Sequence, residues 1–467
     1  MSKLTKLISN PKQFFWDARP LRVVRGALPF EIVLTNDAVK KPSAKSTSIS
    51  ENKSVPKPKN ISVSKKAKQP EKKSVVEELV QIKNSLQSAI NDIPVSNINL
   101  MHHEVALYFS GTMGNIYQVE QWLGPLQTLH EHTPIVIITR VKEVYDWLTF
   151  NTEFVIVYCR TIQDLTSLYE DSNFKCILYV NHGFKNFQSL MYNHALHIHI
   201  NHGESDKTST ITNQAKSYDY IYVVAQAGYD KYDKNLIKKD MNKYIKIGRP
   251  QLEHIPEIES FKTDKTIVLY APTWEGTHES MNFSSLQEYG LPVVQQLISN
   301  PEYFVVYKPH PNTGSRDVNI QNINNAIIDI LNKQEDAKVV LSGDINSIYA
   351  HVDICIFDNS AVAIDYLKTN KPMVMTDMFH RIKGRVDSPI IMNSARMLKP
   401  IDAFNISNII KEEIELDTRK IERQKIKQYF LGDFDYDNGE STSTFVNRIL
   451  EACKERDSLL EENISNR

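Results

Sequence analysis

Six polar side chains follow short apolar runs in the second half of the chain, and their types suit the binding of a phosphate or diphosphate group. Lysine and histidine can donate to phosphate oxygens, and Asp, Asn and Ser are preferred at the start of a helix. Unpaired backbone N–H groups at a helix start supply further donors. A capped helix or a rigid loop would explain each feature alone, but together they predict a diphosphate site at Thr273, Lys308, His310, Asp358, Asn359 and Ser360.

The elements that must position these residues are short strands alternating with single helices. Segments of helical spacing at 345–351 and 361–367 separate apolar runs at 339–341, 354–357 and 373–375. Strands joined by single helices pair in parallel, which predicts a doubly wound α/β sheet. The polar residues would then share the carboxyl edge of one sheet, where such folds bind ligands.

The first half of the chain shows the same rhythm. A strand at 105–109 precedes SGTMGN and a helix over 116–129, and further apolar runs lie at 134–138, 154–157, 176–180 and 219–224. The glycines fall short of a dinucleotide fingerprint, so no nucleotide cofactor is predicted. We expect one α/β domain over 103–258, a second over 259–440 and a C-terminal helix over 441–467.

Two histidines in the first domain each precede a glycine after an apolar run. His182 and His202 could therefore stand at strand ends, where a neutral imidazole can accept a hydroxyl proton near pH 7. His197 and His199 alternate on one strand and could suggest a metal site with His202, but no acidic partner has helical spacing. We therefore predict no metal, and expect Lys308, His310 and helix N–H groups to meet the charge of a leaving group.

Composition separates a basic N-terminal region from an acidic body. Residues 1–73 hold 17 of the 55 Lys and Arg but only 5 of the 56 Asp and Glu. Residues 1–37 combine aromatic and basic side chains, which suits either an interfacial membrane helix or a helix packed on the protein itself. Residues 38–74 have the composition of a disordered linker, and 75–102 that of a helical lead-in. An anionic membrane surface is the expected partner of the tail, with no nucleic acid.

Targeting and redox signals favour a cytoplasmic protein. No apolar run has the length of a transmembrane helix, and no signal peptide is visible. The four cysteines are widely spaced without a C-x-x-C pair, as expected for reduced thiols. We expect a peripheral location on the inner face of the cell membrane.

Six segments, taken in order, resemble the CDP-glycerol glycerophosphotransferases, the teichoic-acid and capsule polyol-phosphate polymerases. They are NHGESDK, SYDYIYV, KIGRPQLE, LYAPTWEG, YKPHP and HVDICIFDNSAVAIDYL. The resemblance covers about residues 175–450 and implies a GT-B-like fold of two facing Rossmann-type domains. It also implies transfer of glycerol or ribitol phosphate from a CDP-activated donor to a growing polymer, with release of CMP.

Roles carry over from this resemblance residue by residue. His202 would be the base that deprotonates the acceptor hydroxyl, and His310 would stabilise the diphosphate. Asp358 and Ser360 match the turn that holds phosphate, and Arg249 matches a basic position of the Gly-x-Pro-Arg segment, although here it precedes the proline. His182 and Lys207 are candidates for the acceptor site.

Departures from the family pattern leave alternatives open. Asn201 stands where the family often has Trp, Ser360-Ala361 replaces Ser-Ser, and His182 begins a second His-Gly pair that could supply the base. The enzyme alternative is a GT-B glycosyltransferase using a nucleotide sugar. A further alternative is a non-catalytic scaffold that binds polyanions or membranes through its basic tail.

Overall fold

The computed structural model describes residues 100–204, 211–276, 282–378 and 389–465. The predicted tail, the linker, nearly all of the helical lead-in and Lys207 lie outside these residues. None of the helices within them is long and apolar enough to cross a membrane.

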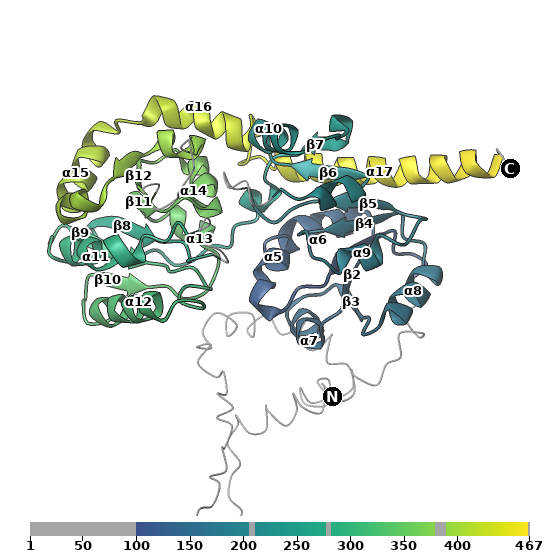
Figure 1. Ribbon diagram of the computed structural model, residues 1–467, viewed down its shortest axis with the longest axis horizontal. Helices are drawn as coiled ribbons and strands as arrows, with labels where there is room; N and C mark the ends of the chain where they lie inside the picture. Colours follow the sequence, from purple (N-terminus) through teal and green to yellow (C-terminus); the bar gives the residue numbers. More distant parts are fainter. Residues whose placement is uncertain (1–99, 205–210, 277–281, 379–388, 466–467) are drawn as a thin grey trace, which may run out of the picture. The chain divides into compact units, whose positions relative to one another are not determined.

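The first sheet consists of seven parallel strands in the order β3-β2-β1-β4-β5-β6-β7 (Figure 1). The chain fills one side of the sheet from β1 outward and then returns to fill the other side from β4. The strand order therefore reverses between β1 and β4, where folds of this kind bind ligands at the carboxyl ends of the strands. The strands are β1 (Val105–Phe109), β2 (Ile135–Thr139), β3 (Val155–Tyr158), β4 (Cys176–Tyr179), β5 (Leu196–His199), β6 (Tyr220–Val223) and β7 (Tyr244–Lys246).

The prediction of one helix over residues 116–129 is wrong in one respect, because the structure has two successive helices there. α5 ends at Glu120, and α6 begins at Leu123 after a residue that caps it, Trp122. Pro125 lacks an N–H and fits the first turn of a helix but not its interior, which explains the restart. The helices of this half are α5 (Tyr117–Glu120), α6 (Leu123–His132), α7 (Lys142–Asn151), α8 (Ile162–Glu170), α9 (Asn186–Ser189) and α10 (Gln226–Asn235).

The second sheet has six parallel strands in the order β10-β9-β8-β11-β12-β13, so its order reverses between β8 and β11. The strand predicted at 339–341 lies two residues earlier. The strands are β8 (Thr266–Ala271), β9 (Tyr303–Tyr307), β10 (Ala337–Val339), β11 (Ile354–Phe357), β12 (Met373–Thr376) and β13 (Arg396–Leu398). The helices are α11 (Leu291–Ile298), α12 (Val318–Leu331), α13 (Asn346–Tyr349), α14 (Ala361–Tyr366), α15 (Ile406–Leu416) and α16 (Lys420–Leu431).

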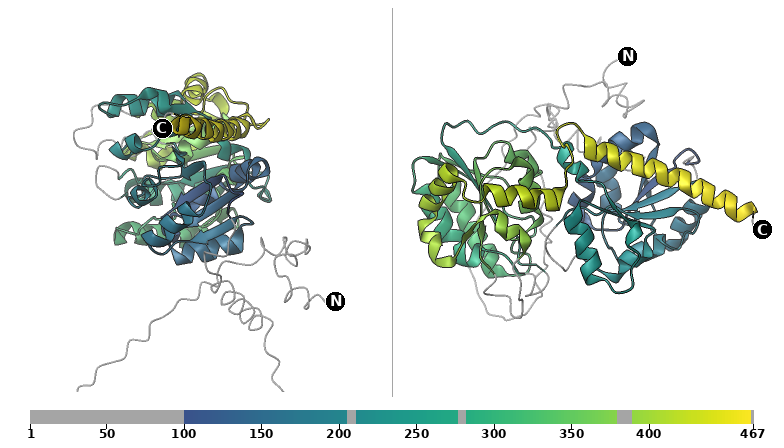
Figure 2. Two further views of the ribbon diagram at one scale, coloured as in Figure 1. Left: turned by 90° about the vertical axis from the view of Figure 1, so that its right-hand side faces the viewer. Right: turned by 90° about the horizontal axis from the view of Figure 1, so that it is seen from above.

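Helices bury both faces of each sheet, as a parallel sheet requires. The last helix, α17 (Glu440–Ser465), follows the second sheet in the chain but packs against the first (Figures 1 and 2). Phe445, Val446 and Ile449 join the apolar cluster that contains β1 and α6. The prediction of two doubly wound α/β sheets is confirmed.

Candidate active site

Asp358 organises the carboxyl edge of the second sheet. Its side chain is fully buried just after β11, and one carboxylate oxygen accepts the backbone N–H of Thr273 at 2.8 Å and of Ser285 at 3.0 Å. The other oxygen accepts the hydroxyl of Thr376 at 2.6 Å. Burial raises the pKa of this carboxyl group, and the hydrogen bonds oppose that rise. Asp358 thus ties together the ends of β8, β11 and β12 instead of presenting its oxygens to a ligand.

Asn359 and Ser360 form the turn into α14. Ser360 is the N-cap residue with an extended backbone, and its hydroxyl donates to the carbonyl of Asp358 at 3.3 Å. The amide of Asn359 is buried, and neither of its polar atoms has a partner among the described residues. The backbone N–H groups at this helix start and the Ser360 hydroxyl can therefore hold a phosphate oxygen.

Lys308 and His310 follow β9 at the same edge. The Lys308 ammonium donates to the carbonyl of Ser342 at 3.1 Å, and burial lowers its pKa to about 8 while Asp344 opposes that shift. The backbone N–H of Asn312 donates to Nδ1 of His310 at 3.1 Å. The neutral ring then carries its proton on Nε2 and can donate to a phosphate oxygen.

Two residues that the sequence did not single out support this loop. The ring of Trp274 stacks on His310, with centroids 5.8 Å apart and planes 18° apart. Glu275 is buried and accepts the backbone N–H groups of Gly314 at 3.0 Å and Arg316 at 2.8 Å. The sequence shows Glu275 directly after the APTW motif, which could have marked it as a candidate. Its partners could not be predicted, because they lie about 40 residues away.

His202 follows β5 in the first sheet and has one ring nitrogen engaged. Its Nδ1–H donates to the carbonyl of Val180 at 2.8 Å, which leaves the lone pair on Nε2. Gln118 lies 3.5 Å from Nε2. Burial lowers the pKa of His202 to about 4, the bond to Val180 opposes that shift, and Arg249 adds to it. The ring is therefore neutral near pH 7 and can take a proton.

His182 follows β4 and stacks on His199. The two ring centroids are 4.0 Å apart and the planes differ by 3°. Burial lowers the pKa of His182 to about 4, and the neighbouring His202 makes a smaller contribution in the same direction. Its Nε2 lies 3.4 Å from the hydroxyl of Tyr232, and its buried Nδ1 has no partner among the described residues. No carbonyl fixes its tautomer as Val180 does for His202.

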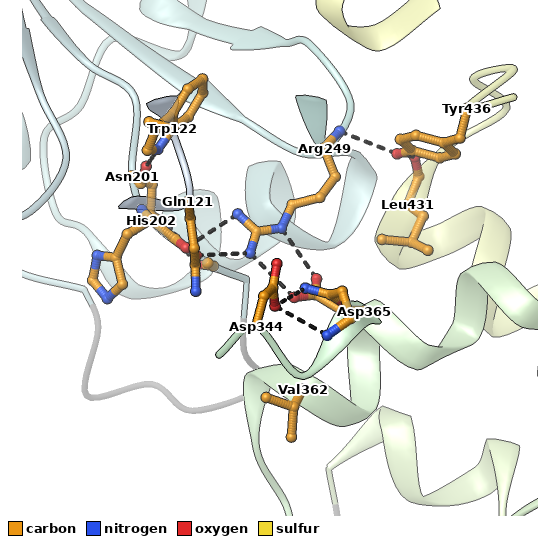
Figure 3. Close-up of polar contacts among 12 residues, drawn as sticks. Gln121, Trp122, Asn201, His202, Arg249, Asp344, Val362, Asp365, Leu431 and Tyr436 are labelled. Carbon is orange, nitrogen blue, oxygen red and sulfur yellow. Dashed lines mark hydrogen bonds and ion pairs between the residues drawn. The ribbon is translucent and has the colours of Figure 1, made fainter. Parts of the chain in front are cut away.

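Arg249 follows β7 and is buried, with its guanidinium directed at protein acceptors (Figure 3). Nε and one Nη pair with the carboxylate of Asp365 at 3.1 and 3.2 Å. The other Nη donates to the carbonyl of His202 at 3.1 Å. Arg249 therefore joins the His202 loop to α14, and its guanidinium contacts protein groups at the place where the sequence suggested a phosphate ligand.

The same loop lies close to the start of α14. A Cβ atom built on Gly203 would lie 3.7 Å from Cβ of Ala361, so the backbone of Gly203 approaches this helix. The structure thus brings the loop that carries His202 near the turn that contains Asn359 and Ser360. Within the described residues, no group of three or more His, Cys, Asp or Glu is arranged to hold a metal ion.

The alternating histidines of β5 differ: the two ring nitrogens of His197 both have protein partners, whereas those of His199 are buried with no hydrogen-bond partner among the described residues. Nδ1 lies 2.8 Å from the hydroxyl of Tyr179, and Nε2 lies 2.6 Å from the carbonyl of Tyr192. His197 is therefore a hydrogen-bonded core residue.

Two Rossmann-type sheets with polar side chains at the carboxyl ends of their strands have the architecture of a GT-B-like transferase. The chain matches the family described as CDP-Glycerol:Poly(glycerophosphate) glycerophosphotransferase over residues 127–451, and it belongs to this family. The predicted family and enzyme class are confirmed.

Solved structures show the same fold at low sequence identity. A histidine-to-asparagine variant of the wall teichoic acid polymerase TagF has a TM-score of 0.51 and 14% identity, over 82% of this chain and 97% of the TagF chain. The variant soaked with CDPG has a TM-score of 0.52 and 13% identity, over 82% and 96%. A search of curated proteins found no match.

Proposed function

We propose that this chain transfers glycerol phosphate, or a related polyol phosphate, from a CDP-activated donor to the terminal hydroxyl of a growing polyol-phosphate or polysaccharide chain. The observation that carries the proposal is the link from the His202 loop through Arg249 to Asp365 of α14, with Gly203 close to the start of that helix. A neutral base then lies beside the turn best suited to hold the donor's phosphates. Membership of the glycerophosphotransferase family supports the donor class.

The proposed reaction is a single displacement at phosphorus. Nε2 of His202 takes the proton of the acceptor hydroxyl as its oxygen attacks the phosphorus that carries the polyol. The bond between this phosphorus and the bridging oxygen of the diphosphate breaks, and CMP leaves with that oxygen. The charge that develops on the phosphate oxygens is stabilised by three sets of donors: Lys308, Nε2–H of His310 and the N–H groups at the start of α14.

The geometry favours His202 over His182 as the base. Val180 fixes the tautomer and orientation of His202, whereas Nδ1 of His182 has no such partner among the described residues. His182 is instead stacked on His199, and we assign it to the acceptor site.

The test is incubation of the purified protein with CDP-glycerol, CDP-ribitol and a panel of nucleotide sugars, with a polyol-phosphate or capsular oligosaccharide as acceptor. Released nucleotide is identified by mass. Release of CMP with extension of the acceptor supports the proposal and names the polyol. Release of a nucleoside diphosphate from a sugar donor would establish the glycosyltransferase alternative, and no turnover with any donor would favour a scaffold.

We also propose that the protein works at the cytoplasmic face of the membrane. The support is the basic and aromatic composition of residues 1–37, which suits an anionic lipid surface. Deletion of residues 1–37 should then reduce binding to vesicles that contain anionic lipid. Unchanged vesicle binding by the truncated protein would contradict this part of the proposal.

A further inference from the structure

The loop that carries His202 has an uncommon backbone conformation. Asn201 has a φ of 55°, in the left-handed region that non-glycine residues avoid. Its own side chain contributes to the turn, since its amide oxygen accepts the N–H of His202 at 2.9 Å and its amide nitrogen donates to the carbonyl of Gly203 at 2.8 Å. Asn adopts this conformation more often than most non-glycine residues, and here neighbouring groups hold it in place.

Two buried side chains from other parts of the chain hold this loop by its carbonyl groups. The indole N–H of Trp122 donates to the carbonyl of Asn201 at 2.5 Å, and Arg249 donates to the carbonyl of His202 at 3.1 Å. Both of these side chains are about 97–99% buried. Figure 3 shows them approaching the loop from different elements.

Each donor is itself fixed. Trp122 lies between α5 and α6 and packs against Phe445 of α17, with ring centroids 5.0 Å apart. Arg249 is locked by its two-pronged pair with Asp365, and its backbone N–H donates to the hydroxyl of Tyr436 at 3.1 Å. A planar guanidinium held by a carboxylate in this way has little freedom left.

Asp365 lies on α14, the helix whose first turn forms the candidate phosphate site. A displacement of α14 would therefore be transmitted through Asp365 and Arg249 to the carbonyl of His202. Arg249 also satisfies the buried charge of Asp365, so the pair cannot be broken without cost.

We propose that Trp122 and Arg249 are positioning residues that fix the orientation of Nε2 of His202. The Arg249–Asp365 pair fixes the position of this ring relative to α14. This inference depends on the proposed role of His202 as the base. For Arg249, it replaces the role of phosphate ligand that the sequence suggested. For Trp122, which belongs to none of the sequence motifs, it assigns a new role.

The first experiment compares Trp122→Phe with Trp147→Phe. Both changes remove one indole N–H, but Trp147 lies on α7, away from the loop. We expect kcat of Trp122→Phe to fall about 10- to 100-fold with less than twofold change in KM for CDP-glycerol, while Trp147→Phe stays at the wild-type rate. A displacement of a reacting group by about 1 Å can lower the rate about 100-fold.

The second experiment repeats Trp122→Phe, Arg249→Lys and Asp365→Asn in a His202→Ala background. Residues that act only through His202 should cause no further loss of the residual activity there. If Arg249 instead bound the donor, Arg249→Lys would raise KM for CDP-glycerol at least tenfold and lower the residual activity again. That result, or an unchanged kcat in Trp122→Phe, would overturn the inference.

A pH profile supplies a readout that general destabilisation would not move. A loosened His202 becomes more exposed, so the acid limb of kcat/KM should shift upward toward the ordinary pKa of histidine in Trp122→Phe and Asp365→Asn. An acid limb that stays in place in both variants would contradict a positioning role. Full activity of His202→Ala would instead reject His202 as the base, and failure to release CMP from any CDP-polyol would reject the proposed function, so these failures are distinguishable from a failure of the positioning role.

Discussion

The Nδ1–H group of His202 donates to the carbonyl of Val180 at 2.8 Å, so this ring has a fixed tautomer with its lone pair on Nε2. His182, at the end of the neighbouring strand β4, shares the His-Gly pattern but has a buried Nδ1 without a partner among the described residues. Two histidines that look alike in sequence therefore differ in the one contact that prepares an imidazole to act as a base.

The first prediction separates these two histidines by substitution. His202→Ala should lower kcat about 10²- to 10⁴-fold, the usual contribution of a general base, with little change in donor affinity. His182→Ala should have a smaller effect on kcat and a larger one on KM for the acceptor. Steady-state kinetics with donor and acceptor varied in turn provide the measurement. The reverse ranking of the two kcat values would assign the base to His182.

The second prediction concerns stability at mildly acidic pH. Burial lowers the pKa of His182 and His202 to about 4 and that of His199 well below its usual value. The unfolded chain, with histidines near pKa 6.5, therefore binds protons that the native state excludes. Their contribution to stability is complete above about pH 6.5 and is lost as pH falls toward 4, by at most about 1.4 kcal/mol per pH unit for each histidine.

Urea unfolding at pH 7, 6 and 5 measures this dependence. His199→Phe removes one of the three groups and should flatten the fall in unfolding free energy below pH 6.5. His132→Phe, on an exposed position at the end of α6, is the matched control and should keep the wild-type slope. Equal slopes for wild type and His199→Phe would count against the effect.

The third prediction distinguishes an organising carboxylate from a ligand-binding hydroxyl. Asp358→Asn removes the buried negative charge that three donors share, and its NH₂ group can be accepted only if the Thr376 hydroxyl rotates, so we expect a loss of about 2–4 kcal/mol in unfolding free energy. Ser360→Ala removes a hydroxyl that caps no backbone N–H, so stability should change little while KM for CDP-glycerol rises. Denaturant unfolding and donor titration are measured on both variants; a stable Asp358→Asn protein with weakened donor binding would make Asp358 a direct ligand.

The fourth prediction tests the junction between β7 and α17. Gly248 has a φ of +74°, and a Cβ atom there would lie 2.4 Å from Oγ and 2.8 Å from Cβ of Ser441. Gly248→Ala combines backbone strain with a clash, so we expect a loss of about 3 kcal/mol or more. Gly343→Ala, with a φ of +83° and open space around it, is the control and should lose only about 1 kcal/mol. Thermal unfolding of the two variants gives the comparison, and similar midpoints would show that Ser441 moves aside freely.

The sequence by itself determined the elements and their chemistry. Apolar runs of three to six residues separated by helical segments predicted parallel sheets, because hydrophobic period and length are local properties. The strand at 354–357 and the polar turn after it were found in full, and His202, Lys308, His310 and Ser360 were placed at strand ends for the same reason. These features depend on residues that are close together in the chain.

The tertiary structure alone decided which of these polar groups are engaged by distant parts of the chain. Asp358 and Arg249 have the residue types of phosphate-site residues, yet both are buried and bonded to partners 73–116 positions away. Trp122 carried no local signal, because its role comes from an interrupted helix and from a carbonyl 79 residues later. Periodicity and motif spacing do not report such long-range pairings. These pairings form when helices and loops pack on the sheets and each buried polar atom must find a partner.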